Sequence, residues 1–137
     1  MRTHRAVALG LVCLLSAASF GAPPDPTKVP PELAKARLAA IRKVYEGYWK
    51  RLQVEGGKFD PEFVYRWSVR WMEAQREAST DKAGQVAAAQ DHLDRMKKFE
   101  KILQASVKTG GTSQAEAAAG EFYRIEAEIA LARAKGR

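Results

Sequence analysis

Apolar residues recur at alternating steps of three and four along four stretches of the chain, a spacing that places them on one face of an α-helix. No stretch alternates apolar and polar residues for long enough to predict a buried strand. The sequence therefore predicts an all-α protein with four helices. The residues predicted to face the core are Ala34, Leu38, Ile41, Tyr45, Tyr48 and Leu52; Val64, Trp67, Trp71, Ala74 and Ala78; Val86, Ala89, Leu93, Met96, Phe99, Leu103 and Val107; and Ala118, Phe122, Ile125, Ile129 and Ala132.

Two glycine pairs separate the helices into two hairpins. Gly56-Gly57 follows the first helix and Gly110-Gly111 follows the third, and glycine supplies the backbone conformations that end a helix and allow the chain to reverse. Residues 79–81, Ser-Thr-Asp, join the second helix to the third with a cap but no glycine or proline. The sequence leaves open whether the chain turns at 79–81 or continues as one helix.

Helix starts are also encoded locally. Asp60 is placed to cap the free amides of the second helix, and Pro61 suits the first helical position because it has no N–H to satisfy. Ser113 and Glu116 have the spacing of a capping box, so the fourth helix is expected to begin near Gln114.

The second glycine pair lies 54 positions after the first, and this offset suggests an internal duplication of a helix, a double-glycine turn and a second helix. Repeat 1 would span about residues 32–79 and repeat 2 about 81–135. The hairpins are expected to form a four-helix bundle or an extended coiled-coil-like assembly. The pairs that match at this offset are Lys43 and Lys97, Tyr45 and Phe99, Glu46 and Glu100, Trp49 and Leu103, Glu62 and Glu116, and Arg70 and Arg124.

The N-terminal residues have the pattern of a secretory signal peptide. Arg2 and Arg5 precede an uncharged apolar run, and small residues follow, with cleavage expected after Gly21. Five of the six prolines then make residues 22–31 a flexible lead-in to a helical domain at 32–137. Whether the leader is cleaved or retained as an anchor stays open, but we expect an exported chain, periplasmic or extracellular and soluble, with no membrane-spanning segment after cleavage.

Cleavage would remove the only cysteine, Cys13, and lower the net charge from +7 to +5. One histidine, His92, would remain, too few for a di-metal bundle that needs two Glu-x-x-His motifs. A serine triad would need His92 as its base, and no Gly-x-Ser-x-Gly motif is present. We therefore expect no catalytic residues, no cofactor and no metal site, with His92 exposed to solvent or to a partner. Acidic residues are interleaved with the basic ones, so nucleic acid is not an expected partner.

The most distinctive patch is the segment Tyr65-Arg66-Trp67-Ser68-Val69-Arg70-Trp71. Trp67 and Trp71 lie one turn apart, as do Arg66 and Arg70, so a row of indoles runs beside a row of cations. Tryptophan and arginine are enriched at the energetic centres of interfaces. The site hypothesis is an interaction surface formed by Tyr65, Arg66, Trp67, Arg70 and Trp71. The alternative is a core stripe with the arginines folded over the indoles.

The segment from Val107 to Lys135 contains a glycine turn, a Thr-Ser helix start and an alanine-rich amphipathic stretch with Glu121-Phe122-Tyr123-Arg124. This segment resembles the periplasmic helical hairpin of TolC-type outer-membrane efflux proteins, a family that is also built from an internal duplication. The resemblance covers about 30 residues well, and this chain has no counterpart to that family's membrane β-strands. It implies a periplasmic helical element that packs with copies of itself or with partner helices.

These patterns favour a non-enzymatic, exported helical scaffold or adaptor, in a cell-envelope or efflux-like assembly. Association would be with a protein partner or with other copies through helical faces. The second hypothesis is a periplasmic ligand-binding or sensing bundle whose aromatic residues line a pocket. The sequence does not identify the partner, the ligand or the oligomeric state.

Overall fold

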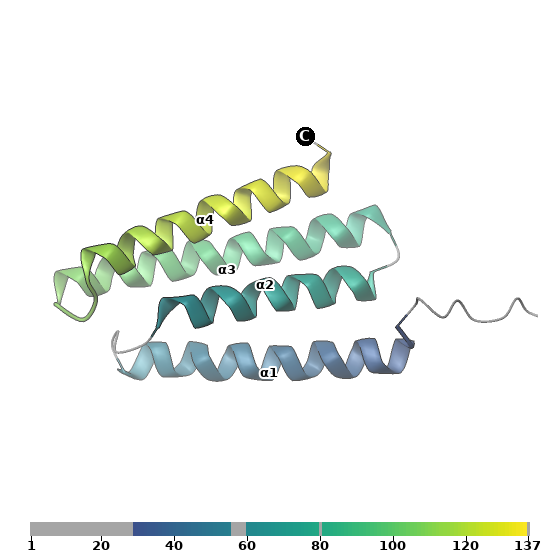
Figure 1. Cartoon of the computed structure of the whole chain (residues 1–137), viewed down its shortest axis with the longest axis horizontal. Helices are drawn as coiled ribbons and strands as arrows, with labels where there is room; N and C mark the ends of the chain where they lie inside the picture. Colours follow the sequence, from purple (N-terminus) through teal and green to yellow (C-terminus); the bar gives the residue numbers. More distant parts are fainter. Residues whose placement is uncertain (1–28, 56–59, 80, 137) are drawn as a thin grey trace, which may run out of the picture.

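The computed structural model describes residues 29–55, 60–79 and 81–136, which form four helices and no strand. α1 spans Pro31–Glu55, α2 Pro61–Ala78, α3 Lys82–Lys108 and α4 Gln114–Lys135. α1 packs on α2 and α3 packs on α4, and α2 also lies against both helices of the second hairpin (Figure 1). The predicted all-α fold of two hairpins is confirmed. The predicted signal peptide, most of the lead-in and the Gly56-Gly57 pair lie outside the described residues.

The described helices form an array in which α1 and α4 do not pack on each other. The backbone of α1 closely approaches only α2 among the described helices, and α1 and α4 lie at opposite edges of the array (Figure 1). Side chains bridge the remaining space between α1 and α3, since the rings of Trp49 and Phe99 have centroids 6.4 Å apart. None of the four described helices therefore packs on the outer face of α1 or of α4.

The predicted helix starts and the second glycine turn are confirmed. The Asp60 carboxylate accepts from the backbone N–H of Glu62 at 2.9 Å, and Pro61 is the first residue of α2. Ser113 and Glu116 form a reciprocal capping box at the start of α4. Gly110 has φ +72°, the left-handed conformation that glycine adopts without strain.

The junction between α2 and α3 is a turn, which settles the question left open by the sequence. Ser79 and Asp81 both have extended backbone conformations and interrupt the helix. Asp81 caps α3, since its carboxylate accepts from the N–H of Gly84 at 2.7 Å. Because the chain reverses here, the second hairpin folds back on the first as a bundle.

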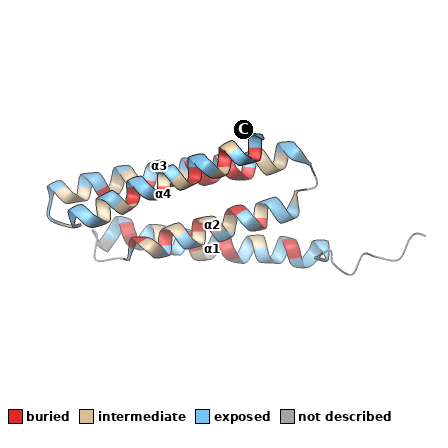
Figure 2. Ribbon diagram, turned by 45° about the horizontal axis from the view of Figure 1, so that its top comes forward, coloured by how far each residue is buried: buried red, intermediate tan, exposed pale blue. Residues whose placement is uncertain are grey.

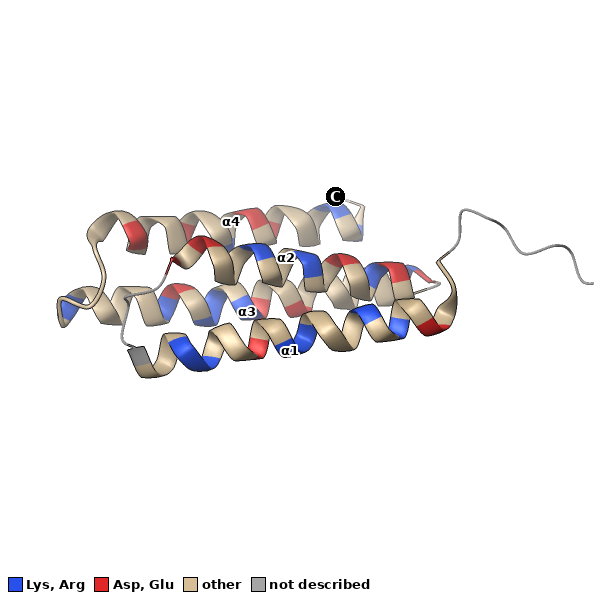
Figure 3. Cartoon of the chain, turned by 60° about the horizontal axis from the view of Figure 1, so that its bottom comes forward, with Lys and Arg blue, Asp and Glu red and all other residues tan. Residues whose placement is uncertain are grey.

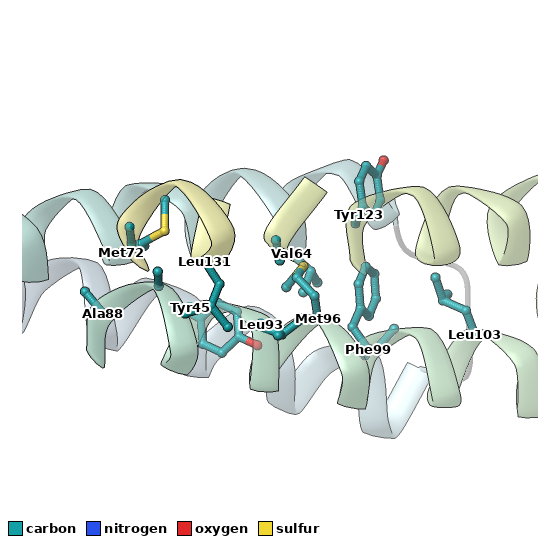
Figure 4. Close-up of a cluster of buried hydrophobic side chains, with 14 residues drawn as sticks. Tyr45, Val64, Met72, Ala88, Leu93, Met96, Phe99, Leu103, Tyr123 and Leu131 are labelled. Atoms are coloured by element: carbon teal, nitrogen blue, oxygen red, sulfur yellow. The ribbon is translucent and has the colours of Figure 1, made fainter. Parts of the chain in front are cut away.

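One hydrophobic core runs between the hairpins (Figure 4). Phe99, Met96 and Val64 are fully buried at its centre, and a large apolar side chain stabilises the fold by about 1.5–3 kcal/mol when it is buried. Five of the seven predicted core residues of the third helix belong to this cluster. Of the six in the first helix, Tyr45 and Leu52 belong to it, and Ala34 and Ile41 are buried outside it. Its buried members are Tyr45, Leu52, Val64, Met72, Ala88, Ala89, Leu93, Met96, Phe99, Leu103, Tyr123, Ala127, Leu131 and Ala134.

The predicted core face of the second helix is partly wrong. The buried row of α2 includes Val64, Ser68 and Met72, whereas Trp67 and Trp71 are only half-buried and Ala78 is exposed. Ser68, and not a tryptophan, occupies the centre of this buried row. Its hydroxyl forms hydrogen bonds with His92 and Arg95 of α3. The indoles pack along the edge of the core instead.

The predicted core face of the fourth helix is wrong. Phe122, Ile125 and Ile129 are exposed by 55%, 41% and 37%. Figure 2 shows exposed and buried positions interleaved along α4. The residues that α4 buries are Gly120, Tyr123, Ala127, Leu131 and Ala134.

Close approach between α4 and α3 explains this choice of face. A Cβ atom at Gly120 would lie 2.9 Å from Leu103 Cδ1 and 3.3 Å from Glu100 Cα, so a larger residue here would require Leu103 and the α3 backbone to shift. Beyond Gly120, the Tyr123 ring stacks on Tyr65 with centroids 4.3 Å apart, and its hydroxyl donates to Glu62 Oε2 at 2.8 Å. The small residues and this tyrosine fit the narrow space, and the larger side chains face away from it.

The duplication remains a prediction. A shift of 54 residues carries the end of α1 to within one residue of the end of α3, and the start of α2 to within one residue of the start of α4. The buried faces do not match, because Ser68 is fully buried whereas its equivalent Phe122 is exposed. The two hairpins therefore have similar lengths, but their second helices, α2 and α4, bury different faces.

Candidate functional site

The five residues of the predicted interaction surface do not share one face. The Tyr65 ring points toward the second hairpin, where it stacks on Tyr123. The Trp71 ring lies on the other side, 5.3 Å from the ring of Tyr45 in α1. Arg66 and Arg70 are exposed, and the Arg70 guanidinium covers the half-buried Trp67 ring at 4.6 Å. A role for these residues in binding a partner stays a prediction.

The expectation that His92 faces solvent or a partner is wrong. His92 is only 2% exposed, and its Nδ1 lies 2.8 Å from the hydroxyl oxygen of Ser68. Burial, together with the nearby charge of Arg95, lowers the pKa of His92 to about 4. The imidazole is therefore neutral near pH 7 and serves as a buried polar link between α2 and α3.

Arg95 extends this link toward α1 and was not recognised from the sequence. Its Nε donates to the Ser68 hydroxyl at 2.8 Å, and its Nη2 donates to the Ser68 carbonyl at 3.2 Å. The guanidinium lies 4.3 Å from the Trp71 ring centroid and 5.7 Å from that of Tyr45. The one sequence signal is its position three residues after His92, which places both on the same side of α3.

Arg95 lines a cleft of about 560 Å³ between α1, α2 and α3, called here the aromatic cleft. The rings of Tyr45, Trp49 and Trp71 form its apolar wall. Tyr45 and Trp49 are stacked, with centroids 5.8 Å apart and planes 19° apart. The remaining lining residues are Glu46, Lys50, Gln53, Asp91, Asp94 and Lys98.

A second candidate surface is the α4 stripe, defined as Ala118, Phe122, Ile125, Ile129 and Ala132. Its members follow steps of four and three and lie opposite the buried face of α4. Glu121, Glu126 and Glu128 lie along its two borders. Soluble monomers rarely expose contiguous apolar rows of this kind without a binding role.

A third surface is the α1 row, defined as Ala40, Val44, Gly47, Arg51 and Val54, on the flank of α1 away from the aromatic cleft. A shallow depression of about 250 Å³ lies along this row, lined by Lys43, Val44, Gly47, Tyr48 and Arg51. Nothing lies within 4 Å of the place where a Cβ atom of Gly47 would be, so the glycine leaves an open notch. Figure 3 shows the basic residues along α1.

Within residues 29–55, 60–79 and 81–136, no group of three or more His, Cys, Asp or Glu side chains is arranged to hold a metal ion. None of the four described helices has the length and apolar character to cross a membrane. Comparisons of the chain with family models, curated proteins and solved structures give no match. The likeness to TolC-type hairpins therefore depends on the sequence pattern alone.

Proposed function

We propose that this protein is an exported, non-enzymatic helical scaffold whose copies assemble head to tail. In this assembly the α4 stripe of one copy packs on the α1 row of the next. The exposed row of Phe122, Ile125 and Ile129 is the observation that carries the proposal. Residues 1–21 act as the signal peptide, and the envelope is the expected location.

The two surfaces fit each other in position and shape. They lie at opposite edges of the array of described helices (Figure 1). The α4 stripe offers large side chains, whereas the α1 row offers a depression with the Gly47 notch. When two helices pack along apolar rows, the side chains of one helix insert into the spaces between side chains of the other. The depression on α1 is a space of this kind.

The charges favour contact between unlike surfaces. Glu121, Glu126 and Glu128 border the α4 stripe, whereas Lys43 and Arg51 line the depression on α1. Two α4 stripes facing each other would bring glutamates together, and like charges suppress a pairing. The contact from α4 to α1 brings acidic and basic borders together instead. Such a contact between two different surfaces generates rings or filaments.

The chain's own packing supplies a precedent. α2 joins the first hairpin to the second through Val64 and Ser68, both fully buried. The 54-residue shift places Ala118 and Phe122 of the α4 stripe at the equivalent positions. Within the chain, this face of α2 packs on the second hairpin. If the two hairpins share an origin, the equivalent face of α4 packs on the first hairpin of the next copy, as in stacked helical repeats. The TolC-type resemblance implies, more generally, packing with other copies or with partner helices.

Sedimentation equilibrium of the purified chain tests this proposal. The unaltered chain is expected to show mass that rises with concentration. Phe122→Glu places a charge in the α4 stripe and Gly47→Arg fills the α1 notch, so each variant is expected to be monomeric. Ala87→Glu, on an exposed position of α3, is the matched control and is expected to assemble like the unaltered chain.

Circular dichroism of each variant separates loss of contact from loss of fold. The proposal fails if the unaltered chain is a monomer throughout the accessible concentrations. It also fails if Phe122→Glu is monomeric while Gly47→Arg assembles normally, because that result indicates contact between two α4 stripes.

A further inference from the structure

We infer that the aromatic cleft is a binding site for a small planar aromatic carboxylate. The inference does not depend on the proposed assembly, because the cleft and the α1 row lie on different flanks of α1. The volume of about 560 Å³ falls in the range of small-molecule sites.

The wall of the cleft accounts for the aromatic part of the ligand. Tyr45 and Trp49 present stacked rings, and Trp71 is tilted against Tyr45 by 58°. Tyr45 is only 5% exposed and Arg95 covers the Trp71 ring, so Trp49 is the ring of this wall against which a planar ligand packs, beside the Arg95 guanidinium. An aliphatic group of the same size gains burial but not this ring geometry.

Arg95 accounts for the carboxylate. Its Nε and Nη2 are fixed by Ser68, and its face covers Trp71. Nη1 has no hydrogen-bond partner, and no carboxylate lies within ion-pair distance of Arg95 in the described part of the chain. Burial lowers the pKa of Arg95, and Asp91 and Asp94 lie near enough to oppose that shift but accept no hydrogen bond from it. A ligand carboxylate would supply the direct acceptor that Nη1 lacks.

The other charged residues that line the cleft are three acids and two lysines. Glu46 is paired with Arg42 at 2.7 Å, and Asp91 and Asp94 accept from Gln75 and Gln90 at 2.8 and 3.0 Å. Lys50 and Lys98 also line the cleft, and neither forms an ion pair with any described residue. Of the acids, only Glu46 has a charged partner within the described ranges, since glutamine amides leave the charges of Asp91 and Asp94 in place. The anion site of the cleft is therefore the Arg95 guanidinium itself, with the two lysines as further cations at its border.

Isothermal titration calorimetry with matched probes tests the inference on the unaltered chain. The probes are indole-3-carboxylate, its neutral analogue indole-3-carboxamide, and cyclohexanecarboxylate. The aromatic carboxylate is expected to bind about tenfold or more tightly than either of the other two, as a charge-assisted hydrogen bond to a partly buried arginine implies. Equal affinity for the carboxylate and the carboxamide, or no heat from any probe at about 1 mM, a typical weak-binding limit, would overturn the inference.

Variants assign the effect to the cleft. Arg95→Met is expected to remove the preference for carboxylate over carboxamide, whereas Trp49→Leu weakens both aromatic probes about tenfold, since a stacking wall is lost. Arg133→Met on α4 is the matched control, with the same change of charge far from the cleft. The same loss in Arg133→Met as in Arg95→Met would indicate general electrostatics and would contradict the assignment. The comparison of probes on the unaltered chain holds even if a variant fails to fold.

Discussion

Acidification should destabilise this protein through His92. In the folded chain its pKa is about 4 because the ring is buried and faces Arg95, whereas an unfolded histidine has a pKa of about 6.5. The folded pKa is the lower one, so the unfolded state binds more protons in this interval. The stabilising contribution is fully present above about pH 6.5 and is lost as the pH falls toward about 4.

The two pKa values set the size of the effect. At pH 5 the unfolded histidine is almost fully protonated and the folded one is mostly neutral, which lowers the free energy of unfolding by about 2 kcal/mol relative to pH 7. Below pH 4 the loss approaches about 3 kcal/mol. Because His92 is only 2% exposed, solvent does little to screen this effect. The Ser68 hydroxyl bonds to the same ring and offers no charge that would stabilise the imidazolium.

Urea denaturation at pH 7 and pH 5 measures this difference, and His92→Gln is the reference because it does not titrate. Carboxylates contribute equally to both chains, so subtraction isolates His92. The unaltered chain should lose about 2 kcal/mol more than His92→Gln between these pH values. If both lose the same amount, the imidazole is accessible to protons in the native state and the buried link between α2 and α3 does not exist as described.

Three further predictions concern packing and capping, each measured by urea denaturation. Gly47→Ala, with open space around it, should stabilise the fold by about 1 kcal/mol. Gly120→Ala should be less favourable than Gly47→Ala by about 1–3 kcal/mol because its Cβ would crowd α3, and equal effects of the two substitutions would refute the close contact. Phe99→Ala should cost about 3–5 kcal/mol, and a loss below about 1 kcal/mol would be inconsistent with its full burial. Ser113→Ala should cost about 1 kcal/mol and Ser113→Gly only a few tenths, so equal losses would argue against the capping box.

Local signals in the sequence predicted the helices well because caps and turns depend on neighbouring residues. Asp60 with Pro61, and Ser113 with Glu116, act within one turn of the chain. The core faces of α1 and α3 followed from spacing, since each has one dominant apolar row. These features need no knowledge of distant contacts.

Features that depend on distant contacts were not predictable. α4 carries apolar residues on two faces, and the prediction chose the face of Phe122, whereas the close approach of Gly120 to α3 turns the face of Tyr123 and Leu131 toward the core. His92 has Asp91 as its neighbour and looked exposed, but its burial depends on Ser68, 24 positions away. Arg95 belongs to the aromatic cleft only because the fold brings Trp71 and Tyr45 beside it.

An equimolar mixture of Phe122→Glu and Gly47→Arg tests the head-to-tail contact most directly. The first variant keeps an intact α1 row and the second an intact α4 stripe, so the mixture can form one productive contact and no more. Sedimentation equilibrium should then show heterodimers from two proteins that are each monomeric alone. A mixture that stays monomeric, or one that forms complexes larger than dimers, would contradict packing of α4 on α1 of the next copy.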